Sequence, residues 1–175
     1  QKLAEKAELQ KPQPRKEYVN GEGFLYLGRS YRLKLVDDQQ TPLKLVAGRF
    51  CLRRDLQPDA KQHFIHWYST KAQIYLNDKV QALAARMGVE PAGVKIQDLG
   101  YRWGSCGRGN RLYFNWKTIL LPCEIVEYVV VHELTHLHEP HHTPQFWKRV
   151  ERVLPDYERR KSWLAKNGIG VEGID

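Results

Sequence analysis

Five of the seven histidines in the chain lie between His132 and His142. In this segment His132 and His136 are four residues apart, and Glu133 follows the first of them. Residues four apart on a helix share one face and lie about 6 Å from each other, so two neutral imidazoles could bind one ion, for which zinc is well suited. Glu133 points aside from this pair, where its carboxylate could reach a metal-bound water. The spacing predicts a zinc site with Glu133 as the general base.

The residues around the motif predict the helix that such a site needs. Pro122 begins a segment with acidic residues in its first turns, and the pattern continues to Glu139, directly before Pro140. The β-branched residues at 125–126 and 129–131 would by themselves indicate a buried strand. The length of the segment and its proline boundaries favour a buried helix instead.

A catalytic zinc ion takes three protein ligands and keeps one position open, so a third ligand is required. The candidates are His138, Glu139, His141 and His142. His138 lies about 160° around the helix from the first two histidines and faces elsewhere. His142 stands at the spacing that metzincins use for their third histidine, although the glycine that lets their chain turn is missing here. The spacing favours His142 and leaves His141 open.

The rest of the chain predicts a mixed α+β domain. The expected elements are a small antiparallel sheet from residues 23–28, 31–36 and 43–52, a long helix over 58–87 ended by Gly88, a hairpin of strands 94–99 and 111–116 around a glycine-bearing loop, and helices beginning at Thr143 and Asp156, the last ending near Gly168. His63 and His66 lie within the long helix and are interpreted as ordinary packed or surface residues. Residues 1–20 are expected to be a linker or the remnant of a missing upstream segment, and residues 21–175 the folded domain.

A set of motifs across the chain carries a family resemblance. It comprises residues 102–106 (RWGSC), Asn115-Trp116, residues 130–137 (VVHELTHL), His142, Phe146-Trp147 and residues 155–157 (PDY). In this combination, over residues 21–165, the chain resembles the YgjP-like metal-dependent hydrolases, relatives of the SprT-like and WLM zinc peptidases.

The resemblance implies a zincin-like fold, with a sheet edge beside the HExxH helix where an extended peptide could lie. It also implies that His142 is the third ligand. Arg102 is a candidate to stabilise an oxyanion or to bind phosphate, whereas Trp103 and Cys106 are expected to pack the loop against the metal helix. Phe146 and Trp147 are expected to be core anchors beneath the site.

Composition narrows the remaining function classes. The formal charge of +8 permits attraction to nucleotides or nucleic acid, and no apolar run is long enough to cross a bilayer, so no membrane partner is expected. The three cysteines are widely spaced and form no CxxC pair, which favours the reducing cytoplasm. The expected function is that of a zinc-dependent hydrolase acting on a peptide or a small molecule, most simply a metallopeptidase. The alternatives are a metal-dependent nucleotide hydrolase that cleaves phosphoanhydrides and a nucleic-acid-associated module with a repair or restriction role.

Overall fold

The computed structural model describes residues 14–168 of the chain. Residues 1–13 of the expected linker lie outside the described residues. Residues 14–20 form no helix or strand, but Tyr18 stacks on Phe24 with ring centroids 5.6 Å apart. This end of the described chain is therefore packed against the first sheet.

The domain combines two small sheets with four helices in the described part of the chain. In chain order the elements are β1 (Gly23–Tyr26), β2 (Arg29–Val36), β3 (Leu43–Val46), β4 (Arg49–Arg53), the short 3₁₀ helix η1 (Arg54–Asp59), α2 (Ala60–Met87), β5 (Gly93–Gln97), β6 (Gly104–Cys106), η2 (Arg108–Asn110), β7 (Arg111–Asn115), η3 (Trp116–Leu120), α3 (Cys123–Thr135), α4 (Pro144–Val153) and α5 (Tyr157–Asn167). The predicted α+β class is confirmed.

The first sheet has the strand order β1-β2-β4-β3 and is mixed. Its central strands β2 and β4 are parallel, with Leu33 opposite Phe50, whereas the flanking pairs are antiparallel. The prediction of an all-antiparallel sheet was therefore wrong. The chain crosses over to β3 and returns as β4 through a turn at Ala47 and Gly48, both with positive φ. Phe50, Cys51 and Leu52 are all buried, as a central strand requires.

The second sheet has the order β5-β7-β6, and it too departs from the prediction. The expected hairpin of 94–99 and 111–116 is in fact the parallel pair β5 and β7. Residues 104–106, placed in a loop by their glycines, form the antiparallel edge strand β6, with Ser105 opposite Tyr113. The local glycine signal was overridden because these residues complete the hydrogen bonding of β7.

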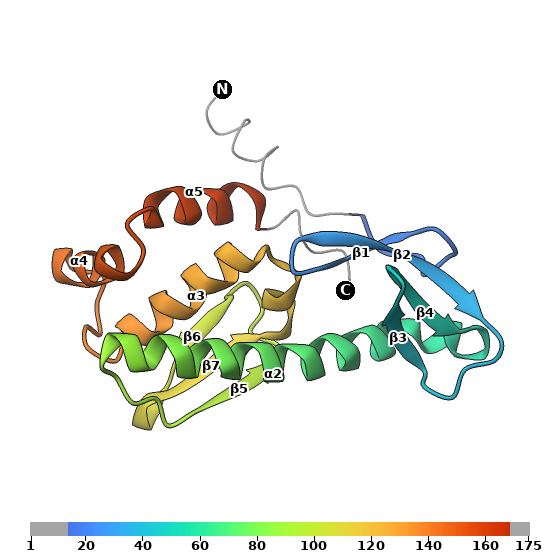
Figure 1. Ribbon diagram of the computed structural model, residues 1–175, viewed down its shortest axis with the longest axis horizontal. Helices are drawn as coiled ribbons and strands as arrows, with labels where there is room; N and C mark the ends of the chain where they lie inside the picture. The colour runs from blue at the N-terminus through green and yellow to red at the C-terminus, as the bar shows by residue number, and fades with distance from the viewer. Residues whose placement is uncertain (1–13, 169–175) are drawn as a thin grey trace.

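Helix α2 connects the two sheets. Figure 1 shows it running along the length of the molecule, with β1–β4 near one end and β5–β7, α3 and α4 near the other. It buries one face, which includes Phe64, Tyr68 and Leu76, and the Tyr68 hydroxyl donates to the Leu25 carbonyl over 2.6 Å. Gly88 ends the helix in the left-handed conformation at a φ of 67°, which glycine adopts without strain.

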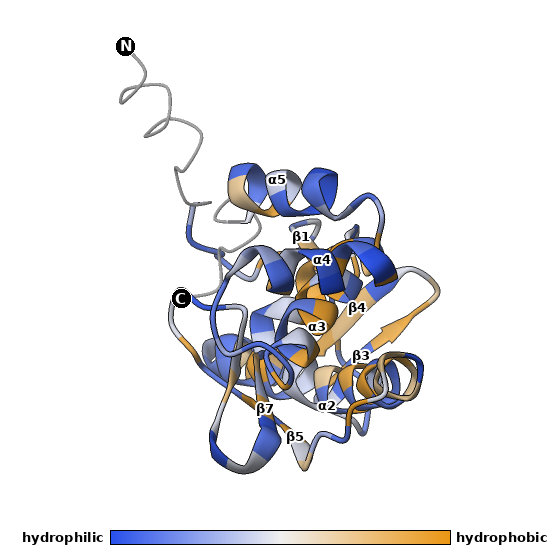
Figure 2. Ribbon diagram, turned by 90° about the vertical axis from the view of Figure 1, so that its left-hand side faces the viewer, coloured by the Kyte–Doolittle hydropathy of each residue, from blue (hydrophilic) through white to orange (hydrophobic). Residues whose placement is uncertain are grey.

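Helix α3 is the buried helix predicted after Pro122, and most of its residues are buried. Figure 2 shows its hydrophobic residues lying inside the more hydrophilic α4 and α5. It ends at Thr135 and not at Glu139, and the Glu139 amide donates to the Thr135 carbonyl over 2.9 Å in the turn that follows. The helix ends early because the chain tightens after Thr135, where the amides of residues 136–138 each donate to the carbonyl three residues earlier. None of the helices in the described range has the length and apolar character needed to span a bilayer.

Candidate metal centre

Three histidine rings converge where α3 ends. His132 comes from the last turn of α3, His136 caps its C-terminus, and His142 lies in the loop before α4. One ring nitrogen from each lies within 4.8 Å of the others, and the Nε2 atoms of His132 and His142 are 3.1 Å apart. Two nitrogens bound to one tetrahedral zinc ion at its usual distances would be about 3.4 Å apart. The donor set and spacing therefore suit one metal ion held by three histidines, and zinc is an ion that accepts such a set.

The protonation of these rings suits metal binding. The Nδ1 of His136 lies 3.1 Å from the Glu139 carbonyl oxygen, to which it can donate, and this leaves the Nε2 lone pair free for a metal. Burial, together with the smaller effect of the neighbouring rings of His136 and His142, lowers the pKa of His132 to about 3. Burial also lowers the pKa of His136. Both rings are therefore neutral at physiological pH, as a ligand must be.

The three rings rest on the start of α4. Thr143 caps this helix by accepting a hydrogen bond from the Phe146 amide over 3.4 Å. The buried Phe146 ring contacts all three histidines, at centroid distances of 5.0, 4.7 and 4.9 Å to His132, His136 and His142. Phe146 is thus the core anchor that the sequence predicted, and its direct contact with every candidate ligand is visible only in the structure.

Trp147 extends this aromatic support toward α5. Its ring stacks on His142 at 5.9 Å on one side and on Tyr157 at 5.4 Å, and the Lys161 ammonium lies 4.1 Å from its centroid. Trp147 is only half-buried, unlike Phe146. It therefore fixes the orientation of the loop histidine from the outside of the domain.

Glu133 lies beside the histidines, but its carboxylate points toward β6. The residue is buried, and burial raises its pKa to about 7, while the positive charge of Arg102 opposes this rise. A β-carbon on Gly104 would come within 2.9 Å of the Glu133 Cγ, so only glycine leaves room for the side chain. Sequence reasoning missed Gly104, although its place within the RWGSC motif was a usable signal.

The loop that carries Arg102 is held in place by Asn115, the last residue of β7. The Asn115 side-chain amide donates to the carbonyls of Gly100 and Arg102, both over 3.1 Å. Arg102 itself is exposed, and its guanidinium lies 3.4 Å from the Ser105 hydroxyl. Asn115 was noted in the sequence only as a motif residue, and the structure gives it this role in positioning the loop.

Cys106 lines the site without joining the histidine cluster. Burial raises the pKa of its thiol, and the nearby Glu133 carboxylate raises it further, so the thiol stays protonated and is a poor ligand. The structure thus places Cys106 as a packing residue of the loop, as expected.

The other histidines do not join the cluster. His138 turns its Nε2 toward the Met87 carbonyl at 3.5 Å, and His141 is exposed. The described residues bring His132, His136 and His142 together, and His141, which the spacing left open, is not among them. His63 and His66 also lie outside this group.

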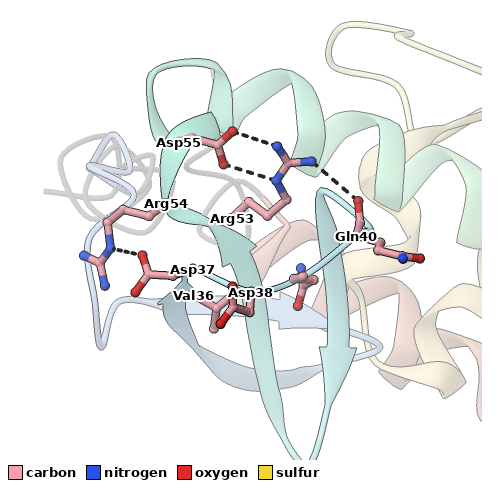
Figure 3. Close-up of a pocket in the computed structure, with 8 residues that line it drawn as sticks. Val36, Asp37, Asp38, Gln40, Arg53, Arg54 and Asp55 are labelled. Atoms are coloured by element: carbon pink, nitrogen blue, oxygen red, sulfur yellow. Dashed lines mark hydrogen bonds and ion pairs between the residues drawn. The ribbon is translucent and has the colours of Figure 1, made fainter.

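The cluster borders a polar hollow of about 450 Å³. Its wall includes Arg102, the β6 residues Gly104 to Cys106, the three histidines and Glu133. A larger hollow of about 690 Å³ lies between the ends of β2 and β4 (Figure 3). There the charges pair with one another, Arg53 with Asp55 at 2.7 Å and Arg54 with Asp37 at 2.9 Å. The polar hollow beside the histidines is therefore the candidate site, although it is the smaller of the two.

An HExxH helix whose end meets a third histidine in a polar hollow is the arrangement of metal-dependent hydrolases. The chain belongs to the YgjP-like family, because the model of the YgjP-like metallopeptidase domain matches residues 1–167.

Among solved structures, the metallopeptidase zymogen abylysin of Pyrococcus abyssi is 25% identical to this chain, and the alignment covers 50% of this chain and 86% of that one with a TM-score of 0.45. Comparison with curated proteins gives no significant match.

Proposed function

We propose that the domain formed by residues 21–175 hydrolyses peptide bonds with a zinc ion held by His132, His136 and His142 and with Glu133 as the general base. The observation that carries the proposal is the convergence of three imidazoles beside a buried carboxylate. Membership of a metallopeptidase family supports the same reaction. A bound zinc ion would supply Lewis-acid chemistry, polarising a carbonyl and lowering the pKa of water.

Glu133 performs the proton transfers in this proposal. Its carboxylate accepts the proton of the attacking water as the oxygen adds to the carbonyl carbon. It then gives this proton to the departing nitrogen as the carbon–nitrogen bond breaks, so the carboxylate is regenerated. The glycine at position 104 lets the carboxylate lie against β6, at the wall of the hollow. The exposed guanidinium of Arg102 can stabilise the oxyanion that develops on the carbonyl oxygen.

The substrate in this proposal is an extended peptide lying along β6. This strand is at the edge of its sheet, where it pairs with β7 alone, and its three residues line the polar hollow. An edge strand offers backbone donors and acceptors to an added strand, which binds a peptide with little regard to its side chains. The reactive carbonyl would then lie between β6 and the histidines of α3.

The alternative functions gain less support. Several arginines near the C-terminal helices are paired with carboxylates, since Arg159 bonds Glu124 at 2.9 Å, Arg160 bonds Glu127 at 3.0 Å and Arg149 bonds Glu139 at 3.2 Å. These pairs leave less of the positive charge free for phosphate groups. The cysteines Cys51, Cys106 and Cys123 are free thiols, which supports a reducing compartment such as the cytoplasm.

The test compares a Glu133→Gln variant with a Glu151→Gln control. Both proteins are loaded with zinc and incubated in parallel with casein, a peptide library and nucleoside triphosphates. Glu133→Gln should retain one zinc per chain and lose about 100-fold or more of the peptidase rate, the usual contribution of a general base. Glu151 lies on the exposed surface of α4, so its variant should cleave like the wild type. Cleavage of triphosphates but not of peptides would overturn the proposal in favour of the nucleotide hydrolase.

A further inference from the structure

A second, apolar hollow adjoins the polar one. Its volume is about 230 Å³, and its apolar wall is formed by Tyr101, Trp103, Tyr128, Val129 and Leu164. Tyr128 and Val129 are buried residues of α3, whereas Tyr101 is 97% exposed and stands at the mouth. Pockets for drug-sized molecules measure roughly 300–1,000 Å³, so this hollow matches a single large side chain.

The hollow is closed on one side by α5, which packs over α3 (Figure 1). A β-carbon on Gly168 would come within 3.1 Å of the Trp103 ring and 3.4 Å of Leu164. The φ of Gly168 is −55°, which any residue can adopt. Glycine is therefore needed here for the space that its missing side chain leaves, and not for its backbone conformation. The end of α5 therefore lies directly on the Trp103 loop, and this contact holds Leu164 as one wall of the hollow.

The two hollows meet at the candidate catalytic residues. Arg102, Gly104, His132 and Glu133 line both of them. Successive side chains of an extended peptide point to opposite sides of the backbone. A peptide whose scissile carbonyl lies at His132 and Glu133 therefore directs a side chain flanking the scissile bond toward the apolar hollow.

We propose that the apolar hollow is a specificity pocket that accepts a large apolar side chain, such as leucine, methionine or phenylalanine, from the substrate residue next to the scissile bond. This inference rests on the proposed function. Its walls offer apolar surface, and a charged side chain of either sign would lose its solvation on entering the hollow. Discrimination comes from the apolar area that the side chain removes from water.

The test uses zinc-loaded protein and a series of peptides that are identical except at one position next to the cleaved bond. Mass spectrometry locates the cleaved bond, and kcat/KM is measured for alanine, leucine, phenylalanine, glutamate and lysine at that position. Leucine or phenylalanine should exceed alanine by about tenfold or more, and glutamate and lysine should both be poorer than leucine. Equal rates for all five residues would overturn the specificity pocket.

Variants of Leu164 test whether this hollow is responsible. Leu164→Phe narrows it and should reduce the preference for phenylalanine over alanine by about tenfold, whereas Leu164→Ala should retain or increase the preference for phenylalanine over leucine. Ile74→Ala is the matched control, because Ile74 is an exposed apolar residue of α2 outside the site, and its preferences should equal those of the wild type. The assignment would be overturned if both Leu164 variants unfold at the same temperature as the wild type and also keep its preferences among the substrate side chains.

The two proposals fail in different ways. If the wild type cleaves no peptide in the series or in the library, the peptidase function itself is wrong. If it cleaves peptides but ignores the flanking side chain, or if the Leu164 variants keep the wild-type preference, the peptidase function stands and only the specificity pocket is wrong.

Discussion

Gly104 and Glu133 are in direct contact, the former on the edge strand β6 and the latter in the HExxH helix α3. A β-carbon at position 104 would approach the Glu133 Cγ to 2.9 Å and the Oε2 to 3.2 Å. Both residues line the polar hollow. The place of the carboxylate is thus set by the absence of a side chain on the neighbouring strand.

A Gly104→Ala substitution should therefore displace the Glu133 carboxylate. Gly104 does not have positive φ, so alanine adds a methyl group without backbone strain. We expect kcat to fall about 10-fold to 100-fold while zinc binding is retained, because a displacement of about 1 Å from the productive geometry can cost this much. Steady-state kinetics and metal analysis of the purified variant measure both. The Gly93→Ala variant provides the control, since a β-carbon on Gly93 meets no atom within 4 Å, and this variant should keep the wild-type rate.

Alanine variants of His142 and His141 should show which of the two histidines binds the metal. His142→Ala should weaken zinc binding more than about 100-fold, because loss of even a hydrogen-bond partner behind a ligand costs 10-fold to 100-fold. His141 is exposed and outside the cluster, so His141→Ala should bind zinc like the wild type. Competition with a chromophoric chelator gives both affinities. The opposite ranking would mean that the loop presents His141 to the ion.

Removal of the metal should lower stability without unfolding the domain. Phe146 and the apolar residues of α3 hold this region together independently of an ion. Zinc at about 1,000 times its dissociation constant should add about 4 kcal/mol to the free energy of unfolding, which raises Tm by roughly 10 °C. Scanning calorimetry before and after chelation measures the shift. Loss of the cooperative transition on chelation would instead identify a structural metal.

The docking of α5 on α3 should depend on Arg160. This side chain is 14% exposed, and it donates to the Glu124 carbonyl, to Glu127 and to Asp156, each over 3.0 Å. Arg160→Ala should reduce the free energy of unfolding by about 1–2 kcal/mol, because charge-assisted bonds in partly buried positions are lost. Arg159 is 55% exposed, and its replacement by alanine should cost under about 1 kcal/mol. Urea unfolding curves of the two variants measure both losses in the free energy of unfolding. Equal losses would contradict the special role of Arg160.

Several elements of the fold could be predicted because their signals are local. The helix α2 follows from apolar residues repeated every three or four positions and from Gly88 at its end. The helix α3 follows from its length and proline boundaries despite its β-branched residues. Strand pairing could not be predicted in the same way, because β5 and β7 pair in parallel with each other while the segment between them pairs antiparallel with β7 as β6.

The sequence by itself determined which residues are the candidates for chemistry in this protein. A helix places residues four apart on one face, so His132, Glu133 and His136 predict a metal site and its base before any tertiary contact is known. Tertiary structure decided which side chains complete the site. The loop after Pro140 brings His142 to the cluster, Gly104 makes room for Glu133, and Leu164 arrives from α5 to wall the apolar hollow. His142 was already favoured by its spacing, whereas Gly104 and Leu164 come from segments distant from α3 in the chain. Residue spacing along one element carries no information about those two contacts.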